Sequence, residues 1–247
     1  MKEEIIKKIN KIEKEKGVRI ILAVESGSRE WGFSSEDSDY DIRCVHVYPS
    51  DRYLGIEPVQ QQIELIENNI DIVSWDIHKF FELFLKSNPT VSEWLSSKEI
   101  YIEKGFGKYS KEKLRAIFEQ GFSRSKIKNH YLSLAKQNYA KYINIRGEVS
   151  LKKYVYVLRA LGCIEYLNKT NSLPPLNWEL SSKYLDKNIK NIFAENVELK
   201  KITESKKGKR NVILDKFIEG ELMKSFEEDK TDFNKDEINK IVIEAIK

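Results

Sequence analysis

The chain has 247 residues, enough for one large domain or two small ones, and 40% of them are hydrophobic, as in an ordinary folded protein. Its net charge of +4 is mild for a chain with 33% charged residues, so contact with a nucleotide or RNA is permitted but not required. No apolar run approaches the ~18–20 residues of a membrane span, and the charged, amphipathic N-terminus is unlike a signal peptide, so neither a membrane protein nor a secreted one is expected.

The first part of the chain alternates helix and strand patterns. Isoleucines at spacings of three and four residues predict a helix over 2–16. An apolar run predicts a buried strand over 18–24, and a turn with a short helical segment follows over 25–33. After a loop of small and acidic residues over 34–38, a second strand is expected over 39–47. Polar residues are therefore expected to connect two core strands.

A hairpin and a helix follow these strands. Residues 49–55 are predicted to form a loop, whereas apolar residues indicate strands over 62–67 and 70–75 that pair antiparallel. Asp76 is a favoured N-cap residue and opens the next helix, which Asn88-Pro89 stops.

Helical periodicity dominates the rest of the sequence. Helices are predicted near residues 90–97, 108–120, 122–145, 150–169, 176–183, 185–203, 211–225 and 234–246. The sequence therefore predicts an α+β fold, with an α/β domain around a mixed sheet over residues 1–105 and an all-helical domain over 106–247.

The two cysteines, Cys44 and Cys163, lie in apolar segments and do not form a metal-binding spacing. We expect both to be buried reduced thiols, which fits a cytoplasmic protein.

Two polar features meet between residues 27 and 43. The Gly27-Ser28 turn follows an apolar strand and can offer backbone N–H groups and a hydroxyl to phosphates. Asp39 and Asp41 are two residues apart on the next strand, so their side chains share a face. Two carboxylates that close repel each other unless a cation lies between them, and Mg²⁺ prefers one or two carboxylates plus waters and phosphates. This pattern indicates nucleotidyl or phosphoryl transfer.

The whole stretch 27–43, Gly-Ser-Arg-x-Trp-Gly-Phe-x-Ser-x-x-Ser-Asp-Tyr-Asp-x-Arg, resembles a known signature. It is similar to that of the DNA polymerase β-like nucleotidyltransferase superfamily, and in particular to the branch associated with bacterial RNA-repair pathways. Residues 75–80, 87–89 and 93–95 extend the resemblance over roughly the first hundred residues. The resemblance implies a minimal nucleotidyltransferase palm, with the helical domain as a substrate-binding domain.

A third carboxylate is expected, since two-metal phosphoryl transfer usually uses three. The resemblance implies that it comes from a later strand beside the Asp-x-Asp strand. Asp71 lies in an otherwise apolar strand, where an acid is costly unless it is paired or metal-bound. Asp76 is the alternative, although its place at a helix start already explains it. We predict that Asp39, Asp41 and Asp71 are the catalytic and metal-binding residues.

Further residues are candidates for nucleotide binding besides Gly27. Ser28 is expected to bond a β- or γ-phosphate. Arg29 either neutralises phosphate charge or pairs with Glu25 or Glu36. Arg43 shares a strand face with the two motif aspartates, so it pairs with them or touches the triphosphate.

One helix of the second domain carries a stripe of similar chemistry. Lys152, Tyr156 and Arg159 are three or four residues apart and would share a helix face. Since Arg binds phosphate bidentately and Lys acts as a point charge, we predict nucleotide binding, with a solvated amphipathic face as the alternative. The role of the basic loop 206–210 is left open.

The sequence thus predicts an enzyme that uses Mg²⁺ (or Mn²⁺) to transfer an NMP from an NTP, with ATP as the expected donor. The resemblance implies an RNA end as one acceptor. Transfer to a small molecule, transfer to a protein partner as in antitoxins, and a catalytically silent nucleotide- or RNA-binding palm stay open as alternatives. The sequence does not indicate an oligomeric state.

Overall fold

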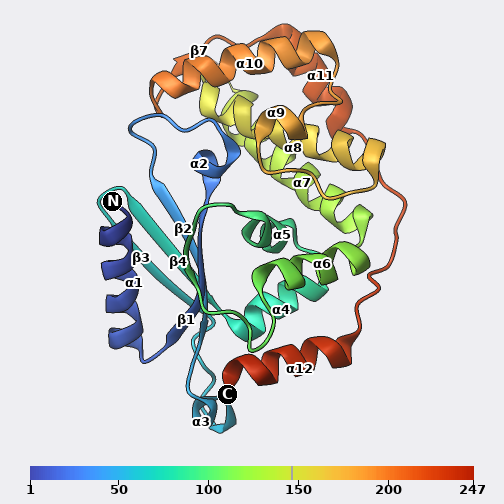
Figure 1. Ribbon diagram of the computed structural model, residues 1–247. Coiled ribbons are helices and arrows are strands. Elements are labelled where there is room, and N and C mark those ends of the chain that lie inside the picture. Colours follow the sequence, from blue (N-terminus) through green and yellow to red (C-terminus); the bar gives the residue numbers. More distant parts are fainter. Residues whose placement is uncertain (146) are drawn as a thin grey trace. The chain divides into compact units, whose positions relative to one another are not determined.

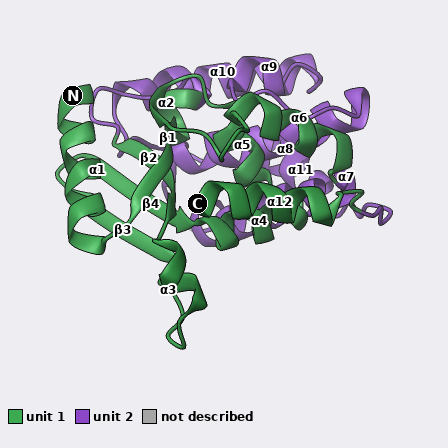
Figure 2. Cartoon of the chain, turned by 60° about the horizontal axis from the view of Figure 1, so that its bottom comes forward, with its two compact units in different colours: residues 1–30, 39–122, 231–247 green, residues 31–38, 123–230 purple. Residues whose placement is uncertain are grey.

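A computed structural model describes residues 1–145 and 147–247. The described chain forms two compact units, each built from separate stretches of sequence (Figure 2). Unit 1 contains residues 1–30, 39–122 and 231–247, and unit 2 contains residues 31–38 and 123–230. The segment 31–38 thus belongs to unit 2, although unit 1 residues flank it on both sides.

Unit 1 is organised around a five-stranded mixed sheet with the order β3-β4-β2-β1-β5 (Figure 1). The strands are β1 (Arg19–Ser26), β2 (Tyr40–Val47), β3 (Gln62–Glu67), β4 (Ile70–Asp76) and β5 (Ile100–Glu103). β2 and β4 pair in parallel, whereas β1 pairs antiparallel with β2 and β5, and β3 pairs antiparallel with β4. This mixed sheet, accompanied by many helices, confirms the predicted fold class.

The register of the central strands brings polar residues of distant sequence to one place. Asp41 on β2 lies opposite Ser26 on β1 and opposite Asp71 on β4. Paired residues of neighbouring strands project to the same face, so the two aspartates lie side by side.

Helix α1 (Lys2–Lys16) covers one face of the sheet with its isoleucine stripe (Figure 1). Ile5, Ile9 and Ile12 pack against sheet residues such as Ile42 and Ile72. The other helices of this unit are α2 (Gly27–Trp31, whose last residue belongs to unit 2), α3 (Ser50–Leu54), α4 (Ile77–Leu85), α5 (Pro89–Ser96), α6 (Lys111–Gly121) and α12 (Lys235–Ile246).

An aromatic core holds the sequence-distant helices of unit 1 together. Phe84 of α4 packs on Phe118 of α6 and on Phe233, each with ring centroids 5.0 Å apart. Phe233 precedes α12, so these contacts explain why the last seventeen residues, 231–247, join this unit.

Unit 2 is mainly helical. Its elements are α7 (Arg124–Asn138), a π-helical turn η1 (Tyr139–Ile143), β6 (Val149–Ser150), α8 (Leu151–Thr170), α9 (Trp178–Ser181), α10 (Lys187–Ile202), β7 (Lys207–Gly208) and α11 (Val212–Leu222). Helix α8 is buried on most of its length, and β6 pairs antiparallel with β7.

Most local predictions are confirmed, but several elements differ from the predictions. The helix over 2–16, the antiparallel hairpin over 62–75 and the Asp76 cap, which accepts the N–H of His78, are as expected. Residues 49–55 contain a short helix rather than only a loop, β5 was not predicted, and the long helix predicted over 122–145 is shorter and ends in the π-helical turn.

Three further points bear on the expectations. Cys44 and Cys163 are buried thiols, as predicted. Within the described residues, the helices are too short or too polar for any of them to cross a membrane. The assignment of a palm to residues 1–105 and of a substrate-binding domain to residues 106–247 stays a prediction.

Candidate active site

The Gly27-Ser28 turn lies directly against the carboxylate of Asp41. β1 ends at Ser26 and α2 starts at Gly27, whose φ of 65° lies in the left-handed region that glycine adopts without strain. A Cβ atom on Gly27 would lie 2.0 Å from Oδ2 of Asp41, so a larger residue would displace that carboxylate. Ser28 is only 3% exposed. The turn therefore places backbone N–H groups, which can bind a phosphate, beside Asp41, which is a predicted metal ligand.

Arg43 bridges the paired aspartates. Its Nη2 donates to Oδ1 of Asp41 at 2.8 Å and to Oδ2 of Asp71 at 3.0 Å. Its Nη1 donates to the carbonyls of Ile42 and Asp71, both at 3.1 Å. The exposed fractions of the side chains are 19% for Arg43, 26% for Asp41 and 27% for Asp71. The two carboxylates are therefore held together and still reachable from solvent.

The donor set at this corner suits the divalent cation that the resemblance implies. Asp41 and Asp71 offer only carboxylate oxygens, and one guanidinium nitrogen already contacts both. Across the described part of the chain, no three His, Cys, Asp or Glu side chains gather as a complete metal cage. Mg²⁺ does not need one, because it takes one or two carboxylates and completes its shell with waters and phosphates. The residues thus fit Mg²⁺ as partial ligands.

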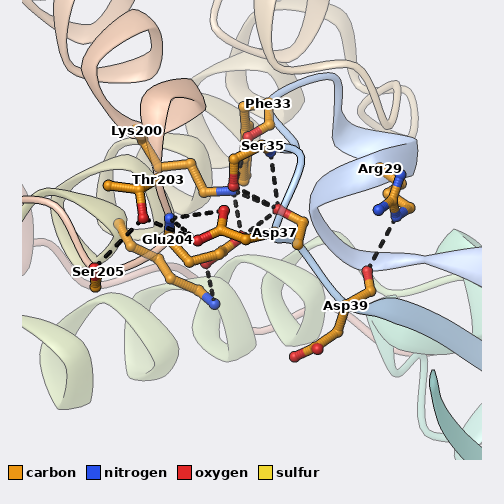
Figure 3. A network of polar contacts seen from close by, with 11 residues as sticks. Arg29, Phe33, Ser35, Asp37, Asp39, Lys200, Thr203, Glu204 and Ser205 are labelled. Atoms are coloured by element: carbon orange, nitrogen blue, oxygen red, sulfur yellow. Dashed lines mark hydrogen bonds and ion pairs between the residues drawn. The ribbon is translucent and has the colours of Figure 1, made fainter. Parts of the chain in front are cut away.

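Asp39 lies just before the first residue of β2. Its carbonyl oxygen accepts a hydrogen bond from Nε of Arg29 at 3.2 Å, and its exposed carboxylate points away from Arg29 (Figure 3). The guanidinium of Arg29 stacks over the Tyr40 ring, 3.7 Å from its centroid. The amide of Tyr40 donates to the carbonyl of Asn69 at 2.7 Å. Arg29 thus contacts the motif backbone and the Tyr40 ring, and its charge also acts to lower the pKa of Glu25.

Glu25 is a candidate that the sequence analysis considered only as a partner for Arg29. Its side chain accepts the N–H of Asp41 at 2.9 Å and the hydroxyl of Tyr101 at 2.6 Å. The residue is 3% exposed, and burial raises the pKa of its carboxyl. An acid inside an apolar strand was the signal that singled out Asp71, whereas Glu25 was predicted to open the turn over 25–33, and only the structure extends the strand to Ser26.

Asp76, the alternative third acid, lies at the other end of β4. It is opposite His46 in the ladder, five residues along from Asp71, or about 17 Å at the rise of a strand. It accepts the hydroxyl of Tyr53 at 2.6 Å and caps α4. The structure therefore places Asp71, and not Asp76, beside Asp41. The catalytic role of Asp71 stays a prediction.

The stripe on α8 lies in unit 2, where it contacts the segment 31–38. The ring of Tyr156 lies 5.6 Å from that of Trp31 and 5.9 Å from that of Phe33, and the Arg159 guanidinium lies 4.0 Å from the Trp31 ring centroid. Nζ of Lys152 pairs with Oε2 of Glu204, in the same unit, at 2.5 Å. These three residues therefore share a face, as predicted, and that face packs against the middle of the motif.

Comparison with known proteins agrees with the signature. The uncharacterized protein YcgL of Bacillus subtilis (strain 168) is 40% identical over 179 residues, which cover 72% of this chain and 67% of that protein. The crystal structure of a nucleotidyltransferase-like protein from Exiguobacterium sibiricum 255-15 matches with a TM-score of 0.32 and 14% identity, over 87% of this chain and 70% of that chain, a likeness too low to carry an argument. The family model RlaP, described as the RNA repair pathway DNA polymerase beta family, matches residues 1–244. The chain therefore belongs to the RNA repair pathway DNA polymerase beta family.

Proposed function

We propose that this protein is a Mg²⁺-dependent nucleotidyltransferase that moves AMP from ATP to an acceptor hydroxyl and releases pyrophosphate. The observation that carries the proposal is the corner where Asp41 and Asp71 lie opposite each other, with the Gly27 turn against Asp41. Membership in a polymerase β-type family supports the same chemistry. Mn²⁺ is expected to replace Mg²⁺, since both are bound by carboxylate oxygens.

The residues divide the work of transfer between them. Asp39, Asp41 and Asp71 would hold the metal, which neutralises triphosphate charge when it is bound. The turn at Gly27-Ser28 binds the β- and γ-phosphates through backbone N–H groups and a hydroxyl. Arg43 holds Asp41 and Asp71 at a fixed separation, so little reorganisation is needed at the moment of reaction.

The proposed reaction is an in-line displacement at the α-phosphorus. A new bond forms between the acceptor oxygen and the α-phosphorus, while the bond from that phosphorus to the β-phosphate bridging oxygen breaks. The leaving group is pyrophosphate, and the hydroxyl proton passes to a carboxylate, for which Asp71 is the candidate. Positioning and charge neutralisation supply most of the rate enhancement in such a site.

An RNA end is the acceptor that the observations favour. The family description names an RNA repair pathway. In unit 2 the β6–β7 ladder pairs Ser150 with Lys207, which brings the basic loop to the start of α8. Lys153 there stacks on Tyr142 at 4.5 Å, and burial together with the cations Lys152 and Lys141 lowers its pKa. Cations held this close together favour a polyanion as ligand.

The test is transfer of label from α-labelled ATP with Mg²⁺ to RNA oligonucleotides, to cell-extract small molecules or to protein. We expect label on RNA, and Asp41→Asn should reduce transfer by about a thousandfold, because the metal loses one of its charged ligands. Asp51→Asn, the same change at an exposed residue of α3, should transfer at the wild-type rate. Full activity of Asp41→Asn would overturn the mechanism.

Other outcomes select the alternatives. Label on a small molecule or on a protein would replace the RNA acceptor and keep the enzyme class. No transfer of label from any of the four nucleotides, combined with saturable nucleotide binding, would favour a silent palm.

A further inference from the structure

The segment 31–38 connects the Gly-Ser turn to Asp39, and it is held by the helices of unit 2. Residues 30 and 39 on either side of it belong to unit 1. An ordinary active-site loop would be solvated, whereas Phe33, Ser35 and Ser38 are 0%, 5% and 1% exposed. Two sets of contacts account for this burial.

The first set is aromatic. Trp31 lies between the guanidinium of Arg159 and the edge of Tyr156, and its ring centroid is 5.7 Å from that of Phe33. These contacts fix the first half of the segment on α8. They require no charge beyond that of Arg159.

The second set is polar and centres on Lys200, whose side chain is fully buried (Figure 3). Its Nζ donates to the carbonyl of Phe33 at 2.9 Å, to the hydroxyl oxygen of Ser38 at 3.1 Å and to Oε1 of Glu204 at 2.5 Å. The hydroxyl of Ser38 also donates to Glu204. Lys200 and Glu204 therefore hold the segment at Phe33 and at Ser38.

Asp37 adds a third connection between the segment and the end of α10. Its carboxylate accepts the hydroxyl of Thr203 at 2.9 Å and the N–H of Glu204 at 3.2 Å (Figure 3). The side chains of Asp37 and Ser38, the last two residues of the segment, are thus hydrogen-bonded to residues 200–204.

A buried lysine is a costly way to attach a loop. Burial lowers the pKa of Lys200, against the opposing effect of Glu204, so the charge is kept at a penalty. Apolar side chains of the same size would hold a loop as firmly or more so, whereas a satisfied polar network holds one conformation. The cost is accounted for if one conformation of Ser38 is needed.

We infer that Lys200 and Glu204 are positioning residues for the metal-binding acid Asp39. They fix Ser38, the residue immediately before Asp39, while Arg29 holds the carbonyl of Asp39 and Asn69 holds the amide of Tyr40 after it. The backbone of Asp39 is thereby held on both sides, and its carboxylate is presented in one direction. This inference rests on the proposed function.

The test measures Mn²⁺ affinity from the free-ion electron paramagnetic resonance signal, together with the Mg²⁺ concentration that gives half-maximal transfer. Asp37→Asn is the decisive variant, because its exposed side chain leaves the core unchanged, and Lys200→Met is the stronger change. Lys201→Met is the matched control, since Lys201 pairs only with Glu198 among the hydrogen bonds and ion pairs of the described residues.

We expect the Mn²⁺ dissociation constant to rise roughly tenfold in Lys200→Met and severalfold in Asp37→Asn, as for other residues that orient metal ligands. Saturating metal should restore the transfer rate, which loss of folded protein would not allow. The control should match the wild type.

Two results would overturn the inference, and they are distinguishable. If the wild type binds Mn²⁺ and both variants bind it equally well, or lose activity that metal does not restore, the positioning role fails and the proposed function stands. If the wild type binds no Mn²⁺ with or without ATP, the proposed function fails and the inference fails with it.

Discussion

In two places in this molecule, a cationic side chain contacts several polar groups in or near the motif. The two places differ in their access to solvent. At the corner of unit 1, Arg43 bridges Asp41 and Asp71, and all three side chains keep about a fifth to a quarter of their surface exposed. In the network of unit 2, Lys200 is fully buried between Glu204 and the segment 31–38. Both places combine a cationic side chain with carboxylates, but of these two the corner alone is accessible to a ligand.

The two places also differ in net charge. The network sets Lys200 and Lys152 against Glu204 and Asp37, so it is neutral as it stands. At the corner, the guanidinium of Arg43 pairs with the two carboxylates of Asp41 and Asp71. These three groups carry a net charge of −1, which a bound divalent cation would offset. An unbalanced, accessible cluster indicates binding, and a balanced, buried one indicates fixed geometry.

Removal of the buried cation should have the largest effect on stability. Lys200→Met leaves the buried carbonyl of Phe33 without this donor and removes one of the donors of Glu204, and we expect a loss of about 3 kcal/mol in the free energy of unfolding. Urea denaturation measures it. The double variant Lys200→Met/Glu204→Met should recover much of the loss, because the carboxylate that lost its buried partner is removed as well. A single variant within about 0.5 kcal/mol of the wild type would break the comparison.

Removal of the accessible cation should cost less and should be reversible by metal. Arg43→Gln removes the guanidinium that bridges two adjacent carboxylates, so we expect a loss of about 1 kcal/mol in the free energy of unfolding in EDTA. Mg²⁺ should restore the melting temperature of this variant by binding the folded state. The melting temperature of Lys200→Met should stay below that of the wild type both in EDTA and in Mg²⁺. Equal melting temperatures of Arg43→Gln with and without Mg²⁺ would show that no ion enters this corner.

The smallest expected effect concerns two glutamates with opposite pH dependence. Burial raises the pKa of Glu25 above its ordinary value of 4.5, so its contribution to stability is complete below that pH and is lost as the pH rises through the raised pKa. For Glu204, burial is outweighed by hydrogen bonds from Lys152, Lys200 and Ser38, which lower the pKa. Its contribution is present above pH 4.5 and is lost as the pH falls through the lowered pKa.

The two glutamine variants should therefore diverge between pH 4 and pH 8. Glu25→Gln should gain stability on the wild type as the pH rises, whereas Glu204→Gln should lose stability, each by less than about 1 kcal/mol. Thermal unfolding across this range measures both. Parallel pH profiles for the two variants would contradict the assigned pKa directions.

Local patterns predicted most of the fold and part of the site. The isoleucine stripe of α1 and the cap at Asp76 follow from periodicity and capping chemistry, which act within a few residues. Asp71 was found because an acid in an apolar strand needs a partner. The strand β5 has only four residues, and none of them is buried, so it carried no comparable signal.

The contacts of the motif itself could not be predicted in this way. Ser38 lies 162 residues from Lys200 in sequence, and no periodicity links positions that far apart. The spacing of Lys152, Tyr156 and Arg159 places them on one face of α8, but a helix face does not reveal what will cover it, and nucleotide binding by these residues stays a prediction. Its contact with Trp31 and Phe33 needed the three-dimensional structure.

The separation between the segment 31–38 and Lys200 also matters during synthesis on the ribosome. The carbonyl of Phe33 accepts a hydrogen bond from Lys200, which is synthesised 167 residues later. At elongation rates of about 5–20 residues per second, this interval is about 8–33 s. Strands β1 and β2 are synthesised long before that moment, so the segment 31–38 between them cannot make these contacts until residue 200 has been added. The fixed geometry of Ser38 beside the Asp-x-Asp motif is thereby deferred until α10 has been synthesised.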